Sequence, residues 1–146
     1  MVAHKDIGSQ IRMLGSVAPG DRAAGAVNGT GIDRMVAESG KGYLSCVLFV
    51  QTGAASGSPT AQTVDAKIQD SADNSTFADY TDPTTAAAAA ITQITADSTN
   101  REKDVNLSNA KRYVRVVLTV AFTGGTSPLW ECNACLALGG SATSNT

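Results

Sequence analysis

The sequence predicts an all-β domain: a jelly roll or β-sandwich of seven to eight strands with an extended N-terminal arm. Three observations favour this class. Short runs alternate apolar and polar residues, turn residues separate these runs at short spacing, and no segment has convincing helical periodicity. A length of 146 residues suits one domain. We expect an N-terminal arm over residues 1–25, the sandwich over 26–140 and a flexible tail over 141–146.

Composition and charge narrow the classes of function. Lys and Arg number 11 against 13 Asp and Glu, so the net charge of −2 provides no basic surface, and we expect no direct nucleic-acid partner. No apolar stretch approaches the ~20 residues of a membrane-spanning helix, so no membrane partner is expected. The start, MVAHKDIGSQ, lacks the apolar run of a signal peptide, and an odd number of cysteines argues against a disulfide framework. The sequence therefore predicts a chain made and folded in a reducing cytoplasm.

The first segment, residues 1–25, is interrupted by glycines and a proline. Its apolar cluster consists of Ile11, Met13 and Leu14, which is too small to form a core of its own. We expect an arm that is either a disordered terminus or a segment that orders on a partner. Both interpretations stay open.

Two strands are predicted in the first half of the sandwich. YLSCVLFVQTG, from residue 43, is a short apolar run ended by Thr-Gly, which is typical of a strand buried on both sides. AQTVDAKIQDS, residues 61–71, alternates cleanly and predicts a strand with one wet face. Its inward residues are expected to be Val64, Ala66 and Ile68.

The segment DPTTAAAAAITQIT, residues 82–95, carries conflicting signals. Five consecutive alanines have high helix propensity, whereas Pro83 and the threonines favour extended or loop structure. We expect one helical turn inside a loop, followed by a strand around residues 91–95. DSTNREKD is expected to be a polar connection, and DVNL, residues 104–107, a short strand.

The most strongly patterned element is KRYVRVVLTVAFTGG, residues 111–125, which predicts a long strand. PLWECNACLALGG, residues 128–140, predicts the last strand, with Trp130 facing inward. We expect these two strands to pair antiparallel through the TGGTS turn. The residues predicted to share the inner face are Val114, Val116, Leu118, Val120 and Phe122 in the first strand and Cys132, Ala134, Leu136 and Leu138 in the second.

No catalytic, cofactor-binding or metal-binding residue is predicted. The single histidine, His4, lies in the arm, where it has no position relative to a nucleophile or acid. Cys132 and Cys135 match a C-x-x-C pair, but no second pair or neighbouring histidine completes a zinc site. Positions three apart on a strand also face opposite ways, so the thiols of Cys132 and Cys135 are expected to be packing residues. The sequence predicts a protein without enzymatic activity and without a cofactor.

The stretch KIQDSADNSTFADY, residues 67–80, is compatible with a calcium loop, a sugar-binding loop, an Asp-box or a hairpin turn. The spacing of an EF-hand loop is absent. An Asp-box needs glycine where Ser75 stands and places its aromatic residue one position later than Phe77. Because Asp73-Asn74 tolerates positive φ between two strand-like runs, the hairpin accounts for the residue types best.

Three stretches together resemble small virion proteins of tailed bacteriophages, among them jelly-roll capsid decoration, or cement, proteins. These are VNGTGIDRMVAESGKGYLSCVLFVQTGA, KIQDSADNSTFADY and AKRYVRVVLTVAFTGG, and the resemblance covers roughly residues 27–140. Its most specific parts are the G-x-D-R entry, the D-x-S-x-F hairpin and the KRYVRV strand that ends in Gly-Gly. The chain departs from such proteins at Asn74, where glycine is common, and in its alanine run.

The resemblance implies a virion structural protein that binds the capsid exterior and bridges neighbouring major capsid protein subunits. Its expected partners are the major capsid protein and further copies of itself, as a dimer or trimer. Two alternatives stay open: another virion component, such as a tail-tube, neck or head-completion protein, or a carbohydrate-binding or adhesin module. The residues predicted to make the contacts are Ile11, Met13, Leu14, Ile32, Arg34 and Met35. Ile32 and Met35 have the alternative role of capping the sandwich core.

Overall fold

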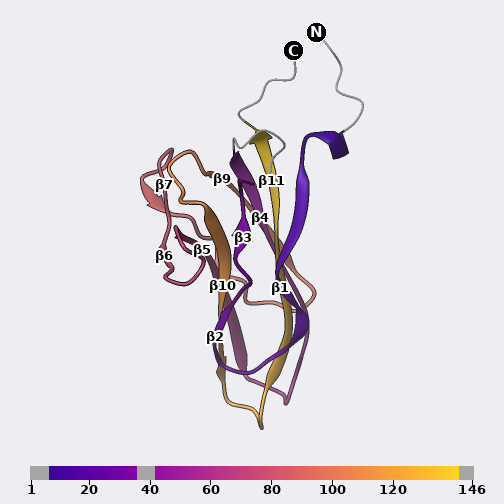
Figure 1. Ribbon diagram of the computed structural model, residues 1–146. Coiled ribbons are helices and arrows are strands. Elements are labelled where there is room, and N and C mark those ends of the chain that lie inside the picture. The colour runs from indigo at the N-terminus through magenta and orange to yellow at the C-terminus, as the bar shows by residue number, and fades with distance from the viewer. Residues whose placement is uncertain (1–6, 36–41, 142–146) are drawn as a thin grey trace.

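Two antiparallel sheets pack face to face in the computed structural model, which describes residues 7–35 and 42–141 (Figure 1). The first sheet has the strand order β1 (Arg12–Arg22), β11 (Leu129–Ser141), β4 (Tyr43–Ser56) and β9 (Asn100–Asn106). The second sheet has the order β2 (Gly25–Asn28), β10 (Tyr113–Thr123), β5 (Ala61–Ser71) and β6 (Ala78–Asp79), and β3 (Ile32–Asp33) also pairs with β10. A small hairpin of β7 (Thr81–Asp82) and β8 (Ala87–Ala88) and a 3-10 turn, η1 (Ile7–Ser9), complete the described elements.

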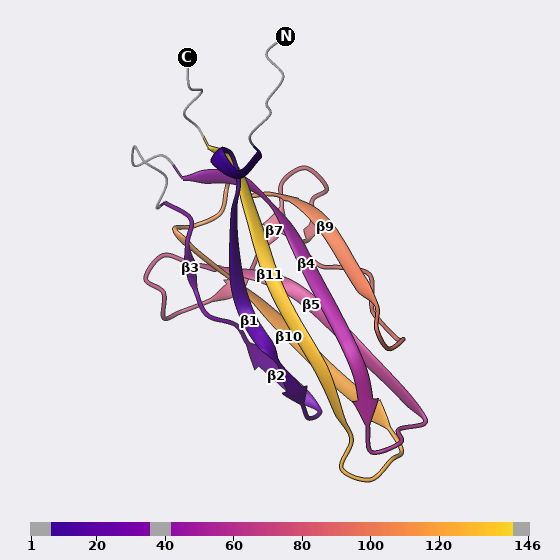
Figure 2. The ribbon, with the colours of Figure 1, turned by 90° about the vertical axis from the view of Figure 1, so that its right-hand side faces the viewer.

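Successive long strands alternate between the two sheets. The chain passes from β1 in the first sheet to β2 in the second, then to β4 in the first and β5 in the second, and β9, β10 and β11 repeat this alternation. Strands far apart in the sequence therefore become neighbours, as β1 and β11 do in Figure 2. This connectivity is that of a jelly roll, and the predicted all-β sandwich is confirmed. Within the described ranges, no helix has the length and apolar character needed to cross a membrane.

The predicted pairing of the last two strands is wrong. β10 pairs with β5, β2 and β3, whereas β11 pairs with β1 and β4 in the opposite sheet. Both strands present an apolar face to the core, so the segment between them must arch from one sheet to the other. Gly124 and Gly125 have positive φ, and Thr126 N–H donates to the Gly57 carbonyl at 2.8 Å in the neighbouring arch between β4 and β5.

The core consists of side chains from both inner faces, and the predicted inward residues of β5, β10 and β11 are confirmed. Trp130 is fully buried and its indole N–H donates to the Gly53 carbonyl at 3.0 Å. The prediction that β4 is buried on both sides is wrong. Its inner residues, such as Leu48, are buried, but Val47 and Phe49 on the outer side are only half-buried, since none of the other described elements forms a layer over them.

The prediction of an arm over residues 1–25 is wrong for residues 12–22, which form β1 and pair with β11. Ser16 and Val17 are buried, and Leu14 packs against the core. Two register shifts, between Gly15 and Val17 and between Val17 and Gly20, let the strand continue past residues that interrupt a regular ladder. The arm's first six residues, including His4, and most of the predicted tail lie outside the described ranges.

The alanine segment forms no helical turn, contrary to the prediction. Ala87 and Ala88 lie in β8, and the chain then runs along the free edge of β5. Val64 and Ile94 exchange both backbone hydrogen bonds at 2.9 Å, and Ile68 N–H donates to the Ala89 carbonyl at 2.8 Å. The exposed ladder groups of β5 therefore override local helix propensity. The expected strand around residues 91–95 is only an isolated bridge at Ile94, and β9 begins earlier than predicted, at Asn100.

The two sheets are also joined where the chain passes Gly29. Its N–H donates to the Val116 carbonyl at 2.8 Å, and the next N–H, of Thr30, donates to the Ser16 carbonyl at 2.7 Å. Ser16 Oγ accepts from Val116 N–H at 2.9 Å and donates to the Thr30 carbonyl at 3.1 Å. A Cβ at position 29 would lie 2.6 Å from the Val116 carbonyl oxygen, so the approach requires glycine.

Candidate interaction surface

The six residues predicted to contact a partner are dispersed. Met13 is 58% exposed and lies on the outer side of β1, whereas Ile11 and Leu14 are half-buried. Ile32 is 6% exposed and belongs to the core, which agrees with its alternative role as a cap. Met35 is half-buried, and its sulfur lies with the Arg34 guanidinium against Gly42. The structure therefore leaves Met13 as the mainly exposed member of this set.

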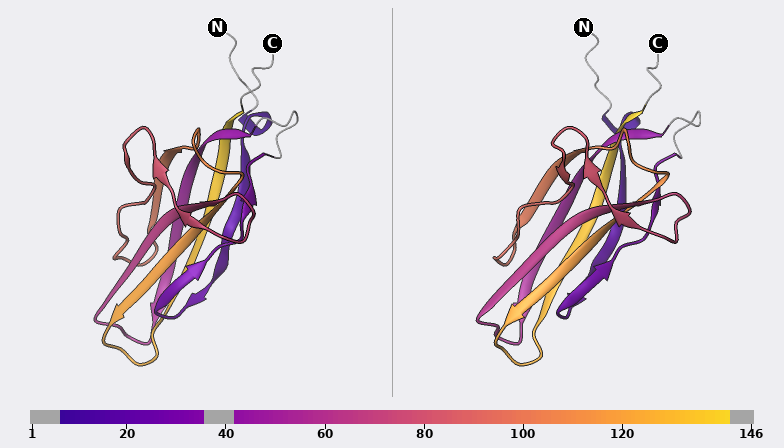
Figure 3. Two further views of the ribbon diagram at one scale, coloured as in Figure 1. Left: turned by 60° about the vertical axis from the view of Figure 1, so that its left-hand side comes forward. Right: turned by 90° about the vertical axis from the view of Figure 1, so that its left-hand side faces the viewer.

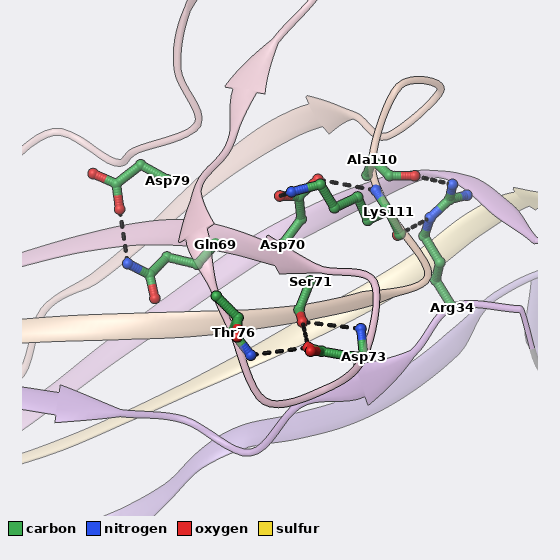
Figure 4. A network of polar contacts seen from close by, with 9 residues as sticks. All are labelled: Arg34, Gln69, Asp70, Ser71, Asp73, Thr76, Asp79, Ala110 and Lys111. Atoms are coloured by element: carbon green, nitrogen blue, oxygen red, sulfur yellow. Dashed lines mark hydrogen bonds and ion pairs between the residues drawn. The ribbon is translucent and has the colours of Figure 1, made fainter.

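Arg34 is buried by the loop that precedes β10 and is held by main-chain carbonyls (Figure 4). Its Nε donates to the Lys111 carbonyl at 2.7 Å, its Nη1 to the Tyr43 carbonyl at 3.0 Å and its Nη2 to the Ala110 carbonyl. Burial lowers the pKa of Arg34, opposed by the nearby charge of Asp70. Because its donors are used inside the fold, Arg34 links β3, β4 and this loop and does not present its charge to a partner.

The stretch at residues 67–80 is a hairpin, as predicted. β5 pairs with β6 through Gln69 opposite Asp79, and Asn74 has a φ of 59° at the turn. Asp73 Oδ1 accepts from Ser71 Oγ at 2.8 Å and from the Thr76 N–H at 2.9 Å (Figure 4). It also accepts from the Ser75 N–H at 2.9 Å. These hydrogen bonds, led by that from Thr76, hold the pKa of Asp73 far below its ordinary value. The carboxylate that suggested an ion site thus organises the turn itself.

The base of the hairpin carries a network of side chains on the outer side of the second sheet. Asp79 accepts from Lys67 Nζ at 2.7 Å and from Gln69 Nε2 at 2.8 Å. The Oε1 of Gln69 accepts from Arg115 at 2.8 and 3.1 Å, and the Arg115 guanidinium lies 4.1 Å from the centre of the Phe77 ring. Figure 3 shows the hairpin and the following loops on this side of the molecule. The outer side of the second sheet is therefore partly occupied by the chain's own side chains.

The cysteines do not gather into a site. Cys132 is buried and Cys135 is half-buried on the opposite side of β11, as the strand geometry predicts. Burial raises the pKa of Cys132 to about 11 and that of Cys46 to about 12, which keeps both thiols protonated at neutral pH. No group of three His, Cys, Asp or Glu side chains in the described parts of the chain is placed to hold a metal ion.

The outer side of the first sheet carries an apolar strip that the sequence interpretation missed. One row across the sheet joins Met13, Ala137 and Val47, which are register partners on β1, β11 and β4. The next row joins Gly15, Cys135 and Phe49. All six residues are half-buried or exposed, and Figure 2 shows their strands side by side, with this sheet facing the viewer. We call these six residues the apolar strip.

A depression beside the strip holds no catalytic combination of side chains. This shallow depression lies near the end of the first sheet where β11 begins, and its single ionisable group is Glu131, among small and amide side chains. Its lining residues are Pro19, Gln51, Thr52, Gly53, Ser98, Glu131 and Asn133. A surface of this form can contact another macromolecule over an area but offers no acid, base and nucleophile in reach of one another.

Comparison with known proteins found no match to a family model and no match among curated proteins.

Proposed function

We propose that this chain is a structural protein of a tailed-phage virion that binds the outer surface of the capsid and stabilises neighbouring major capsid protein subunits, without catalysing a reaction. The observation that carries the proposal is the apolar strip on a sheet face that no other described element covers. Exposed apolar patches on a soluble domain commonly mark a protein contact. The resemblance of residues 27–140 to phage virion proteins supports a shell as the partner.

The architecture suits a protein that stabilises a shell mechanically. Long strands such as β4, β10 and β11 span the sandwich, and the arches at its end are bonded to each other through Thr126 and Gly57. Buried polar groups such as Arg34 and Ser16 join separate elements. A rigid module of this kind loses little conformational entropy when it docks, and many copies on one shell convert modest affinity into strong attachment.

The carbohydrate-binding alternative is disfavoured by the aromatic side chains. Sugar sites of β-sandwich modules usually present exposed aromatic rings for stacking. All seven aromatic residues of this chain lie in the described ranges, and each is either buried or half-buried. Trp130, the largest of them, is fully buried in the core.

Quantitative mass spectrometry of purified virions of the phage that encodes the chain tests the proposal. A decoration protein is expected in numbers comparable with the major capsid protein. A small, ring-sized copy number would instead indicate a neck or tail component. Absence of the chain from virions would refute the virion assignment, and a glycan array then tests the adhesin alternative.

A further inference from the structure

The charged side chains of β9 are divided by sign between the two sides of the strand. Glu102 is the register partner of Phe49, and Asp104 is the register partner of Val47, so both carboxylates extend the two rows of the apolar strip. Both are exposed. One side border of the strip is therefore acidic.

A second pair of carboxylates lies beyond the strip, toward the end of the first sheet where β1 ends and β11 begins. Asp21 on β1 is the register partner of Glu131 on β11, and both side chains are exposed. The carboxylate of Glu131 reaches across Gly53 of β4, where a Cβ would lie 2.4 Å from Glu131 Oε2. This contact places Glu131 on the outer side of the sheet.

The cationic side chains of the edge strands β1 and β9 lie on the other side of the sheet, the core side. Arg101 and Lys103 on β9 are partners of Val50 and Leu48, whose side chains point into the core. On β1, Arg12 and Arg22 are partners of the buried residues Leu138 and Trp130. Because side chains alternate along a strand, these cations extend from the margins of the core side. The strands of the first sheet, as described, thus present carboxylates and no Lys or Arg on their outer side.

The four carboxylates also lack salt-bridge partners in the described parts of the chain. The ion pairs found there join Lys67 to Asp79, Lys111 to Asp70 and Arg112 to Asp33, all in or beside the second sheet. Among the described residues, the charges of the second sheet are therefore partly paired with one another, whereas the outer side of the first sheet has carboxylates without a paired cation beside the apolar strip.

We infer that the outer side of the first sheet, the apolar strip with Glu102, Asp104, Asp21 and Glu131, is the surface that docks on the capsid, and that its receptor site is an apolar contact bordered by Lys or Arg. This inference rests on the proposed function and adds to it the docking face and the chemistry of the receptor. Complementary charge around an apolar centre steers association and fixes orientation. A second copy docked through the same face brings carboxylates against carboxylates, which argues against self-association there.

Binding to heads purified from a phage deleted for the gene tests the inference, with matched pairs of variants. Ala137→Arg places a bulky cation in the apolar strip, and Ala121→Arg makes the same change at an exposed site on β10. Glu102→Lys reverses a charge beside the strip, and Asp65→Lys does so on the exposed outer side of β5. Urea unfolding of each variant establishes that it is folded.

We expect Ala137→Arg to weaken head binding at least about tenfold and Glu102→Lys to weaken it severalfold, the latter effect shrinking as salt is raised. Ala121→Arg and Asp65→Lys are expected to bind like the wild type. If the wild type itself fails to bind heads, the proposed function is wrong.

If the wild type binds and the two first-sheet variants bind equally well, or the two second-sheet variants are the ones that lose binding, the docking face is wrong. Sedimentation supplies a further outcome. A wild-type dimer that Ala137→Arg converts to monomers would mean that a second copy occupies the face, which would also overturn the inference.

Discussion

Ser16 joins the two sheets through a side chain, and replacing it with alanine gives a stability change that can be estimated from the contacts. Its Oγ accepts the N–H of Val116, a fully buried residue in the middle of β10, at 2.9 Å. The ladder between β2 and β10 stops at Asn28 and β3 resumes it at Ile32, so no neighbouring strand supplies an acceptor for this N–H. Ser16→Ala leaves the donor buried and unpaired.

An unsatisfied buried donor costs about 1–3 kcal/mol. The other partner, the Thr30 carbonyl, belongs to an exposed residue that water can reach, so it adds little. No carbon is removed, so no apolar burial is lost. We therefore expect Ser16→Ala to lower the free energy of unfolding by about 2 kcal/mol, which corresponds to a fall in Tm of roughly 4–8 °C for a domain of this size.

Urea unfolding followed by fluorescence of the buried Trp130 measures this change, with an unchanged m-value as the sign that only stability has moved. Ser56→Ala is the matched control, because Ser56 is exposed and its Oγ makes only a long hydrogen bond of 3.4 Å to the Leu129 carbonyl. A loss below about 0.5 kcal/mol for Ser16→Ala, the range of ordinary surface substitutions, would refute the reasoning.

Two further predictions concern Arg34 and Asp73. Arg34→Met leaves the carbonyls of Tyr43, Ala110 and Lys111 without their donors and is expected to reduce the free energy of unfolding by about 3 kcal/mol in chemical denaturation. Arg34→Lys should not restore this stability, because one ammonium group cannot span the three carbonyls. Full recovery of stability by lysine would contradict the geometry. The pKa of Asp73 is depressed by hydrogen bonds that favour the ionised carboxylate, so its stabilisation of the turn is present above the unfolded-state pKa of about 3.9 and is lost only as pH falls through the lower folded value. Amide chemical shifts of Ser75 and Thr76 should therefore titrate well below pH 3.9, and a midpoint near 3.9 would show that the turn does not hold the carboxylate.

Period-two alternation predicted which side of a strand faces the core but not which sheet the strand joins. Val64, Val116 and Trp130 were placed inward correctly because the alternation of apolar residues is local information. The pairing of β10 with β11 was wrong because Gly124 and Gly125 suit an arch between sheets as well as a hairpin within one. The choice between them depends on partners far away in the sequence.

The same non-local dependence explains the other corrections. β1 is a strand because β11 offers it an edge, despite the register shifts between Gly15 and Val17 and between Val17 and Gly20. The alanine segment is extended because β5 has unpaired ladder groups beside it. Arg34 looked like a surface cation because the carbonyls that bury it come from distant residues of β4 and the loop before β10.

The candidate surface could be predicted only in part. The apolar cluster of Ile11, Met13 and Leu14 predicts Met13 as a contact residue, and Met13 lies in the apolar strip. Val47 and Phe49 were missed because an uninterrupted apolar run normally indicates a strand covered on both sides. Here the run is covered on one side, and the leftover apolar side is what a partner would need. The alternation of charge along NREKDVN was the available signal, since it separates the carboxylates of β9 from its cations.

Thiol alkylation of Cys135 on and off the capsid tests the central claim most directly. Cys135 lies in the apolar strip and is half-buried, whereas Cys46 and Cys132 are 4% and 1% exposed and serve as internal controls. With N-ethylmaleimide and mass spectrometry, we expect Cys135 to be the thiol that reacts in the free protein and to be protected when the protein is bound to heads. Equal alkylation of Cys135 in the free and head-bound protein would show that the outer side of the first sheet does not face the shell.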